Sequence, residues 1–171
     1  MDSDADGLPD YLEIQFKADP DKPDSDNDGY KDGLEVEKGY DPTKDDGAKL
    51  KKRIEVDLAK QELKYYLGPV QLGTFRVSTG KKSTPTPKGT YVIKNKALRP
   101  LSISYHVYMP YWMGLSSPGI GIHDLPEWGV NKKEPVSTLG TPASHGCIRL
   151  ASAPAKKMYE WAEVGTEVKI Y

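Results

Sequence analysis

Residues 144–150 read SHGCIRL, and this heptapeptide holds the only cysteine of the chain, Cys147. His145, one of three histidines among the 171 residues, lies two positions before it. A free cysteine is often only a small buried apolar residue, but it is a nucleophile when a base and oxyanion donors surround its thiol. The sequence around the heptapeptide has to decide between these two roles.

The heptapeptide supplies much of what a thiol nucleophile needs. Gly146 allows the backbone to approach a substrate closely, and its N–H and that of Cys147 are candidate oxyanion donors. Arg149 adds a positive charge that favours the thiolate. Upstream, His123 ends the apolar run GIGIH, 24 residues before Cys147. We therefore interpret His123 and Cys147 as a thiol–imidazole pair, and His106 as structural or substrate-lining.

Alternating apolar and polar residues after Lys51 predict a mostly β domain with one main helix, built as a sandwich or a barrel-like sheet. The helix begins at Ser152, a good N-cap, and ends at Gly165. One face of it presents Met158, Trp161 and Ala162. The expected strands form a hairpin over 53–68 and then follow at 70–80, 89–95, 103–113, 119–125 and 166–171.

The combination of IGIH, SHGCIRL, VSTGKKSTPTPKGTYVI and MPYWM resembles the L,D-transpeptidase catalytic domain over roughly residues 51–171. The resemblance implies that Cys147 is the acyl-forming nucleophile and His123 its general base, oriented by the main-chain carbonyl of Asp124. It also implies supporting residues: His145 and Gly146 shaping the pocket, Ser144 bonding within the turn, Arg149 contacting substrate carboxylates, and Tyr105, Met109, Tyr111 and Trp112 lining a lid or substrate groove.

One position departs from the pattern of this family, because Asp124 follows His123 where glycine is usual. If only the carbonyl of Asp124 is used, the change is tolerable. If its carboxylate turns onto His123, it would raise the imidazole pKa. The intervening loop 124–143 is long and carries Trp128, Lys132 and Lys133, which we expect to influence the choice of acceptor.

The resemblance implies a transferase that acts in cell-wall biogenesis and cell shape. A thioester at Cys147 would form on a peptidoglycan tetrapeptide stem with loss of D-Ala, and the amine of a second stem would then give a 3→3 cross-link. Acylation by β-lactams of the carbapenem class is implied as well. Water, a protein amine or a free D-amino acid as acceptor stays open, the first making an L,D-carboxypeptidase. A calcium-dependent wall-binding module with an inactive domain is the alternative from another class.

Charge divides the chain into two modules. Residues 1–48 hold 16 Asp and Glu against 5 Lys, a net charge of −11, whereas residues 49–171 have a net charge of +10. A basic surface suits an anionic, carboxylate-rich wall and gives no reason to expect nucleic acid. The sequence contains no apolar run long enough to span a membrane and no secretory signal. Because Met1 leads directly into an acidic motif, we expect a piece of a longer precursor, and the acidic motif favours an extracytoplasmic or secreted setting rich in calcium.

The acidic module repeats with a period of 22 residues: DSDADGLPDYLE at 2–13 aligns with DSDNDGYKDGLE at 24–35. Each copy has carboxylates at positions 1, 3, 5, 9 and 12 and glycine at position 6, a spacing that wraps a loop around Ca²⁺, with the position-7 carbonyl as a further ligand. The predicted ligands are Asp2, Asp4, Asp6, Leu8, Asp10 and Glu13, then Asp24, Asp26, Asp28, Tyr30, Asp32 and Glu35.

Position 8 of the repeat differs from an EF-hand, because it holds Pro9 and Lys31 instead of an aliphatic residue. The segment ADPDKP also leaves no room for an entering helix before Asp24. The repeats instead resemble bacterial thrombospondin type 3 repeats, and a dockerin-like module would need longer helices after each loop. We expect calcium to be structural here, and catalysis in the second module to need no cofactor.

Overall fold

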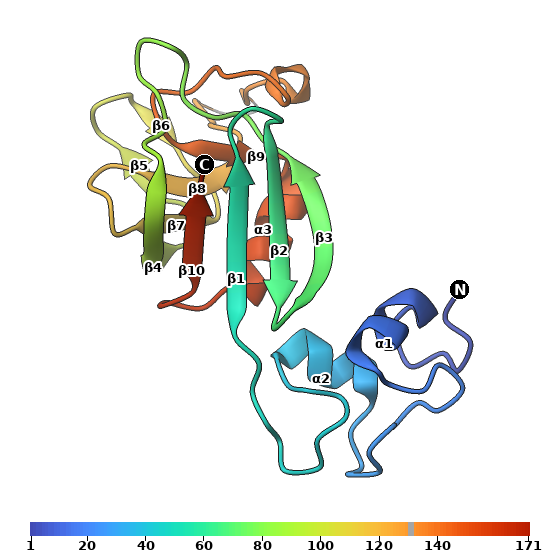
Figure 1. The fold of residues 1–171 in the computed structure, drawn as a ribbon. Helices are drawn as coiled ribbons and strands as arrows, with labels where there is room; N and C mark the ends of the chain where they lie inside the picture. Colours follow the sequence, from blue (N-terminus) through green and yellow to red (C-terminus); the bar gives the residue numbers. More distant parts are fainter. Residues whose placement is uncertain (130–131) are drawn as a thin grey trace. The chain divides into compact units, whose positions relative to one another are not determined.

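A computed structural model describes residues 1–129 and 132–171 (Figure 1). The chain forms two compact units. The first joins Met1–Lys52 to Tyr65–Leu72, and the second joins Arg53–Lys64 to Gly73–Tyr171. Compared with the predicted boundary between residues 48 and 49, this division assigns the tip of a hairpin at 65–72 to the acidic unit.

Most strands of the chain belong to one eight-stranded sheet in the order β3-β2-β1-β10-β4-β7-β8-β9, which confirms the mostly β class (Figure 1). Two pairs in it are parallel, β1 with β10 and β8 with β9, and the second pair carries the candidate site. The strands are β1 (Lys52–Asp57), β2 (Glu62–Leu67), β3 (Val70–Arg76), β4 (Gly89–Ala97), β7 (Trp112–Leu115), β8 (Gly121–Asp124), β9 (Ile148–Leu150) and β10 (Glu167–Ile170).

The main helix α3 (Ser152–Trp161) packs on β8 and β9. Met158, Trp161 and Ala162 are buried, as the helical spacing predicted. The prediction that Ser152 is the N-cap was wrong, because Ala151 occupies that position and Ser152 is the first helical residue. The Ser152 hydroxyl is used elsewhere, in contacts with Asp124 and Lys133.

The predicted strand over 103–113 is also wrong. The chain there forms a separate two-stranded ladder of β5 (Leu101–Ser102) and β6 (Val107–Tyr108) before it enters β7. His106 and Tyr111 adopt φ values of 52° and 56°, which lie in the left-handed region and turn the chain out of an extended path. A short 3₁₀ helix, η1 (Val136–Thr138), interrupts the loop before the heptapeptide.

The 22-residue repeat of the sequence is also a repeat of the backbone. The two loops lead into α1 (Asp10–Phe16) and α2 (Asp32–Lys38). Equivalent residues share left-handed φ values, 59° and 63° at Ala5 and Asn27, and 68° and 91° at Lys17 and Gly39. Two copies with the same turns and the same helix ends are two folded loops, which a disordered acidic tail would not produce.

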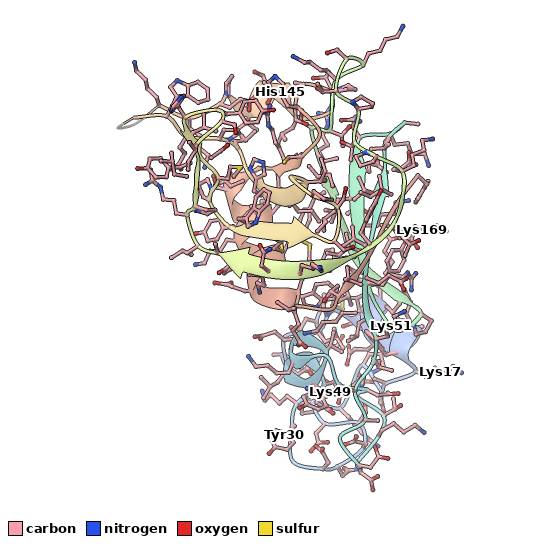
Figure 2. The ribbon with its side chains drawn as sticks, turned by 90° about the vertical axis from the view of Figure 1, so that its left-hand side faces the viewer. Lys17, Tyr30, Lys49, Lys51, His145 and Lys169 are labelled. Atoms are coloured by element: carbon pink, nitrogen blue, oxygen red, sulfur yellow. The ribbon has the colours of Figure 1, made fainter. Side chains whose placement is uncertain are left out.

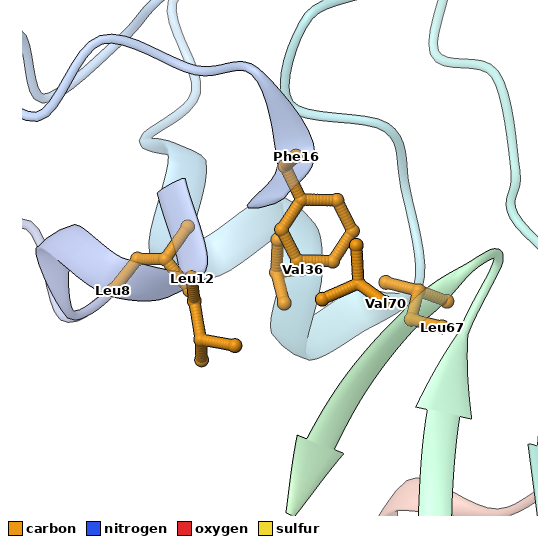
Figure 3. Packing of buried hydrophobic residues seen from close by; sticks show 6 residues of the cluster. All are labelled: Leu8, Leu12, Phe16, Val36, Leu67 and Val70. Atoms are coloured by element: carbon orange, nitrogen blue, oxygen red, sulfur yellow. The ribbon is translucent and has the colours of Figure 1, made fainter. Parts of the chain in front are cut away.

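The first unit has its own small apolar core (Figure 3). Phe16 of α1 and Val36 of α2 pack with Leu67 and Val70, which flank the turn between β2 and β3. Leu67 is fully buried and Val70 is 4% exposed. The acidic repeats therefore do not form a core from their own residues alone, and the hairpin tip completes it.

Candidate active site and candidate calcium loops

The register of β8 and β9 determines which side chains share a face. His123 lies opposite Arg149, and Ile122 lies opposite Ile148. Because side chains alternate between the two faces of a sheet, His123 and Arg149 point to one face and the two buried isoleucines to the other. Cys147 directly precedes β9, two residues before Arg149. The predicted base is therefore on β8, and the predicted nucleophile is at the start of the neighbouring parallel strand.

The turn that presents Cys147 is braced from inside by Ser144, which is fully buried. Its hydroxyl donates to the carbonyl of Cys147 at 2.6 Å and accepts from the N–H of Gly146 at 3.0 Å. Thr86 supports the turn from outside by donating its hydroxyl to the carbonyl of Gly146 at 2.8 Å. Ser144 thus bonds within the turn, as predicted, and the turn is fixed before any substrate arrives.

Gly146 occupies a conformation that suits only glycine. Its φ is 119°, and a Cβ there would lie 2.8 Å from Cδ1 of Ile120. Its N–H already donates to Ser144, so the predicted role of this N–H as an oxyanion donor would require the bond to be exchanged. Within the described residues, no acceptor faces the N–H of Cys147, which makes it the better placed of the two predicted donors.

His123 is held in one tautomer by the backbone. Its Nδ1 donates to the carbonyl of Asp124 at 2.5 Å, which leaves Nε2 unprotonated and able to accept a proton. The ring is 2% exposed, and its centroid lies 5.8 Å from that of Trp112. Burial lowers the pKa of His123 to about 4, with the Asp124 carbonyl opposing the shift and the positive charge of Arg149 adding to it. The imidazole is neutral at pH 7.

The thiol of Cys147 is neutral at the same pH. Burial raises its pKa above the ordinary value of 9.0, although a backbone hydrogen bond at Gly121 and the charge of Arg149 act in the opposite direction. The Sγ atom lies 3.6 Å from the carbonyl of Gly119. Both shifts favour a neutral thiol and a neutral imidazole over a thiolate and an imidazolium, and the charge of Arg149 favours the thiolate but disfavours the imidazolium.

Arg149 has a protein partner for its charge. Its Nη1 donates to the carboxylate of Glu134, with 2.9 Å to each oxygen, and both side chains are largely buried. The predicted contact of Arg149 with a substrate carboxylate would have to compete with this ion pair. In the structure Arg149 supports the site from the strand that follows Cys147.

The structure shows how Asp124 is used at the position where glycine is usual. Its carbonyl accepts from His123, while its carboxylate turns away from the imidazole. That carboxylate pairs with Lys133 and accepts from the N–H of Leu125 at 2.7 Å. The first of the two expectations for Asp124 is therefore the one that the structure adopts. Trp128, Lys132 and Lys133 of the loop are described, whereas residues 130 and 131 lie outside the described residues.

His145 is exposed at the surface of the second unit (Figure 2). The ring of Tyr105 stacks on it with 4.8 Å between centroids, and Nζ of Lys81 lies 3.3 Å from its Nε2. Tyr105 comes from the connection between β5 and β6, so this stack joins that segment to the residue two positions before the nucleophile. The arrangement suits a pocket wall and a lid, the roles predicted for His145 and Tyr105.

The other predicted substrate residues divide into two groups. Trp112 lies near His123, and its indole N–H donates to Asn95 at 3.0 Å, which fixes the ring. Tyr111 instead faces Tyr159 of α3 at 5.8 Å, and only a backbone bond to Pro100 is described for Met109. The structure brings Tyr105 and Trp112 to the site and gives no such support for Tyr111 and Met109.

Acidic side chains converge in each repeat of the first unit. One carboxylate oxygen from each of Asp2, Asp4 and Asp6 lies within 4.8 Å of the others, and Asp24, Asp26 and Asp28 form the same group in the second repeat. Hard oxygen ligands at this density are what Ca²⁺ requires. The position-1, -3 and -5 residues of both predicted loops are thus brought together.

Buried carboxylates without partners support a cation at these loops. Both oxygens of Glu13 and Oε2 of Glu35 are buried and have no hydrogen-bond partner in the described part of the chain. Burial first, and neighbouring aspartates second, raise the pKa of Glu13 to about 7 and that of Glu35 to about 8. An unpartnered buried carboxylate is costly, and a bound divalent cation would remove the cost. The position-12 glutamates fit their predicted role.

Position 9 of the repeats is used differently. The carboxylate of Asp10 accepts from the N–H and hydroxyl of Ser3 at 2.8 and 2.9 Å. Asp32 accepts in the same way from Ser25 at 2.8 and 2.5 Å. These aspartates close the loops, and a calcium contact from either would need its second lone pair or a water. Leu8 and Tyr30 are predicted to bind calcium through their main-chain carbonyls, so their side chains give no evidence on this point.

Sequence reasoning missed Lys81, Thr86 and Glu134 and gave Lys133 a different role, although all four support the site through contacts across the fold. No local spacing relates them to Cys147. The hydrogen bonds of Ser3 to Asp10 and of Ser25 to Asp32 were also missed, although serine at position 2 of both repeats could have indicated them.

Comparison with known families finds two matches. A model described as the L,D-transpeptidase catalytic domain matches residues 51–170, and a model described as the bacterial TSP3 repeat matches residues 24–44. YciB of Bacillus subtilis, whose name assigns it to the L,D-transpeptidases, is 34% identical over 129 residues. That match covers 70% of this chain and 66% of YciB, so the chain spans just under two thirds of this relative.

Solved structures share the fold of the second unit. An L,D-transpeptidase of Enterococcus faecium has a TM-score of 0.56 and 30% identity, covering 71% of this chain and 50% of its own. L,D-transpeptidase 3 of Mycobacterium tuberculosis, solved with a faropenem-derived adduct, has a TM-score of 0.60 and 19% identity, covering 72% and 61%. At that identity the second likeness concerns the fold alone.

Proposed function

Because the chain belongs to the L,D-transpeptidase catalytic-domain family, we propose that it transfers an acyl group from a peptidoglycan tetrapeptide stem to an amine through a thioester at Cys147. The proposal is supported by the parallel pairing of β8, which holds His123, with β9, which Cys147 directly precedes, and by the bond of His123 Nδ1 to the Asp124 carbonyl. That arrangement leaves one imidazole nitrogen to exchange a proton with the thiol.

The first step begins from the neutral pair. Nε2 of His123 takes the thiol proton as Sγ of Cys147 attacks the carbonyl of the third stem residue, and the N–H of Cys147 donates to the oxygen that becomes negative. When the tetrahedral intermediate collapses, the C–N bond to D-Ala breaks and the imidazolium returns its proton to the leaving amine. The thioester then remains on Cys147.

In the second step an amine attacks the thioester carbonyl. A new C–N bond forms, the C–S bond breaks, and one proton passes from the amine through His123 back to sulfur. A side-chain amine of another stem gives a 3→3 cross-link, and water in its place gives the product of a carboxypeptidase. Two acyl transfers replace one difficult amide exchange, which is the advantage of the covalent route.

The test is incubation with a purified disaccharide-tetrapeptide, analysed by mass spectrometry beside Cys147→Ala. A dimer that has lost one D-Ala, absent with the variant, supports the transpeptidase. A tripeptide monomer keeps the nucleophile but makes the protein a carboxypeptidase. An unchanged tetrapeptide with calcium present contradicts the proposal, and wall binding that survives Cys147→Ala would then favour the binding module.

We also propose that the first unit binds Ca²⁺ as a structural ion through Asp2, Asp4, Asp6 and Glu13, and through their equivalents Asp24, Asp26, Asp28 and Glu35. The support is the convergence of the aspartates and the unpartnered glutamates. Calcium titration followed by calorimetry should raise the unfolding temperature, because an ion that binds only the folded loops stabilises them. No rise at millimolar calcium would contradict the proposal.

Membership of the L,D-transpeptidase family supports the proposal that carbapenems acylate Cys147, and imipenem is the probe. Intact-protein mass spectrometry should find an adduct that Cys147→Ala lacks. None of the described helices is long and apolar enough to cross a membrane. A peptidoglycan substrate and calcium-loaded repeats both favour an extracytoplasmic location, which we propose for the chain.

A further inference from the structure

The loop between His123 and Cys147 carries two adjacent residues of opposite charge, Lys133 and Glu134, and each pairs with a different strand of the site. Nζ of Lys133 donates to the carboxylate of Asp124 in β8. Glu134 accepts from Nη1 of Arg149 in β9, with 2.9 Å to each oxygen. Two consecutive residues of one loop thus hold both parallel strands.

Burial gives these ion pairs more weight than surface pairs have. The side chain of Asp124 is 2% exposed and that of Lys133 is 30% exposed, while Arg149 and Glu134 are 13% and 14% exposed. An exposed pair contributes about 0–1 kcal/mol, but removal of one partner from a buried pair leaves an uncompensated charge. The loop is therefore fixed on the strands at both points.

The ion pair of Lys133 with Asp124 is linked to the proposed base, His123, through the main-chain carbonyl of Asp124. Asp124 is the residue whose carbonyl accepts from Nδ1 of His123. Its side chain is held by Lys133, by the N–H of Leu125 at 2.7 Å and by the hydroxyl of Ser152 at 3.3 Å. Fixing the side chain fixes the backbone torsions of Asp124 and hence the direction of its carbonyl. A glycine at this position would offer no side chain to hold.

We propose that Lys133 and Glu134 form a positioning clip that sets the imidazole of His123 against the thiol of Cys147. Lys133 acts through the Asp124 carbonyl, and Glu134 acts through Arg149, which lies opposite His123 and two residues after Cys147. Neither residue touches the thiol or the imidazole in the described contacts, so both are positioning residues. The benefit of the clip for acyl transfer rests on the proposed function. The positioning itself would affect any reaction of Cys147 that uses His123.

The experiment measures the second-order rate of iodoacetamide alkylation of Cys147 across pH, in the full chain with calcium. Lys133→Met removes the contact to Asp124, and Lys133→Arg keeps the charge as the conservative variant. Lys132→Met is the matched control, because it removes the same charge from the neighbouring exposed position, and alkylation uses no acceptor amine. Asp124→Asn is the second variant, since it keeps an oxygen for the Leu125 N–H. Calorimetry confirms that each variant is folded.

Support for the clip is a fall in alkylation rate of about tenfold in Lys133→Met and Asp124→Asn, the size typical when the group that orients a site ligand or base is lost. Lys133→Arg should keep most of the parent's alkylation rate, and Lys132→Met should match the parent. The double variant Lys133→Met with Asp124→Asn should be no slower than the slower single variant, because both changes break the same contact. Parent-like alkylation in Lys133→Met, or an equal fall in Lys132→Met, overturns the proposal. Tetrapeptide turnover is assayed separately, so its absence contradicts the proposed function and leaves the alkylation result intact.

Discussion

The burial of His123 predicts that acid destabilises the fold through this one residue. Its pKa is lowered from 6.5 to about 4, so the unfolded chain accepts a proton at pH values where the folded chain does not. Stability is therefore complete above pH 6.5 and is lost as pH falls toward 4. A shift of two to three pKa units corresponds to about 3 kcal/mol of unfolding free energy.

The assay is urea denaturation of the parent and of His123→Asn at pH 7 and at pH 4, in the presence of millimolar calcium. Asparagine cannot be protonated in this range, and its amide can still donate to the Asp124 carbonyl. Every other titrating group is common to both proteins, so the difference between their losses isolates His123. The parent should lose about 3 kcal/mol more than the variant, and about 2 kcal/mol more at pH 5.

Equal losses in the two proteins would refute the reasoning, because they would mean that His123 is protonated as easily in the fold as in the unfolded chain. A smaller loss in the parent than in the variant would also contradict the neutral resting pair, since an imidazolium at pH 7 requires a folded pKa above 7. The measurement thus tests the starting state of the reaction without using a substrate.

Three further predictions concern other parts of the chain. The raised pKa of Cys147 predicts that its alkylation rate keeps rising above pH 9, and a plateau below pH 7 would contradict this. Gly146→Ala should lower the unfolding free energy by about 1–3 kcal/mol and slow alkylation of Cys147, because alanine is strained at φ 119° and its Cβ meets Ile120. Gly165→Ala, with φ 96° but open space around it, should leave alkylation unchanged. Urea denaturation measures the stability of each variant, and iodoacetamide measures its alkylation rate. Calcium should slow amide hydrogen exchange at residues 65–72, and equal exchange with chelator would contradict the shared core.

The nucleophile and base could be predicted because rare residues stood in a distinctive spacing. The parallel pairing of β8 and β9 puts His123 opposite Arg149, two residues after Cys147. The clip could not be predicted, because Lys133 and Glu134 look like any solvated charge pair until the loop is folded. Long-range ion pairs leave no period in a sequence.

The prediction of a continuous strand over 103–113 was wrong for a related reason. Its aromatic and β-branched residues favour a strand, and the turns that interrupt it use His106 and Tyr111 in left-handed conformations. Glycine or asparagine would have signalled such turns, whereas these residue types do not. Tertiary contacts of the chain, including the backbone bond from Tyr111 to the carbonyl of Leu98, compensate for the local preference.

In the acidic repeats, composition and packing divide the chain at different places. Charge changes sign near residue 48, so composition divides the chain there. Packing divides it differently, because Phe16 and Val36 need Leu67 and Val70 to complete a core. Calcium at the loops would fix the two helices that carry Phe16 and Val36. A metal that orders the repeats therefore also orders the hairpin tip, and a chain cut at residue 49 would expose Leu67 and Val70 to water.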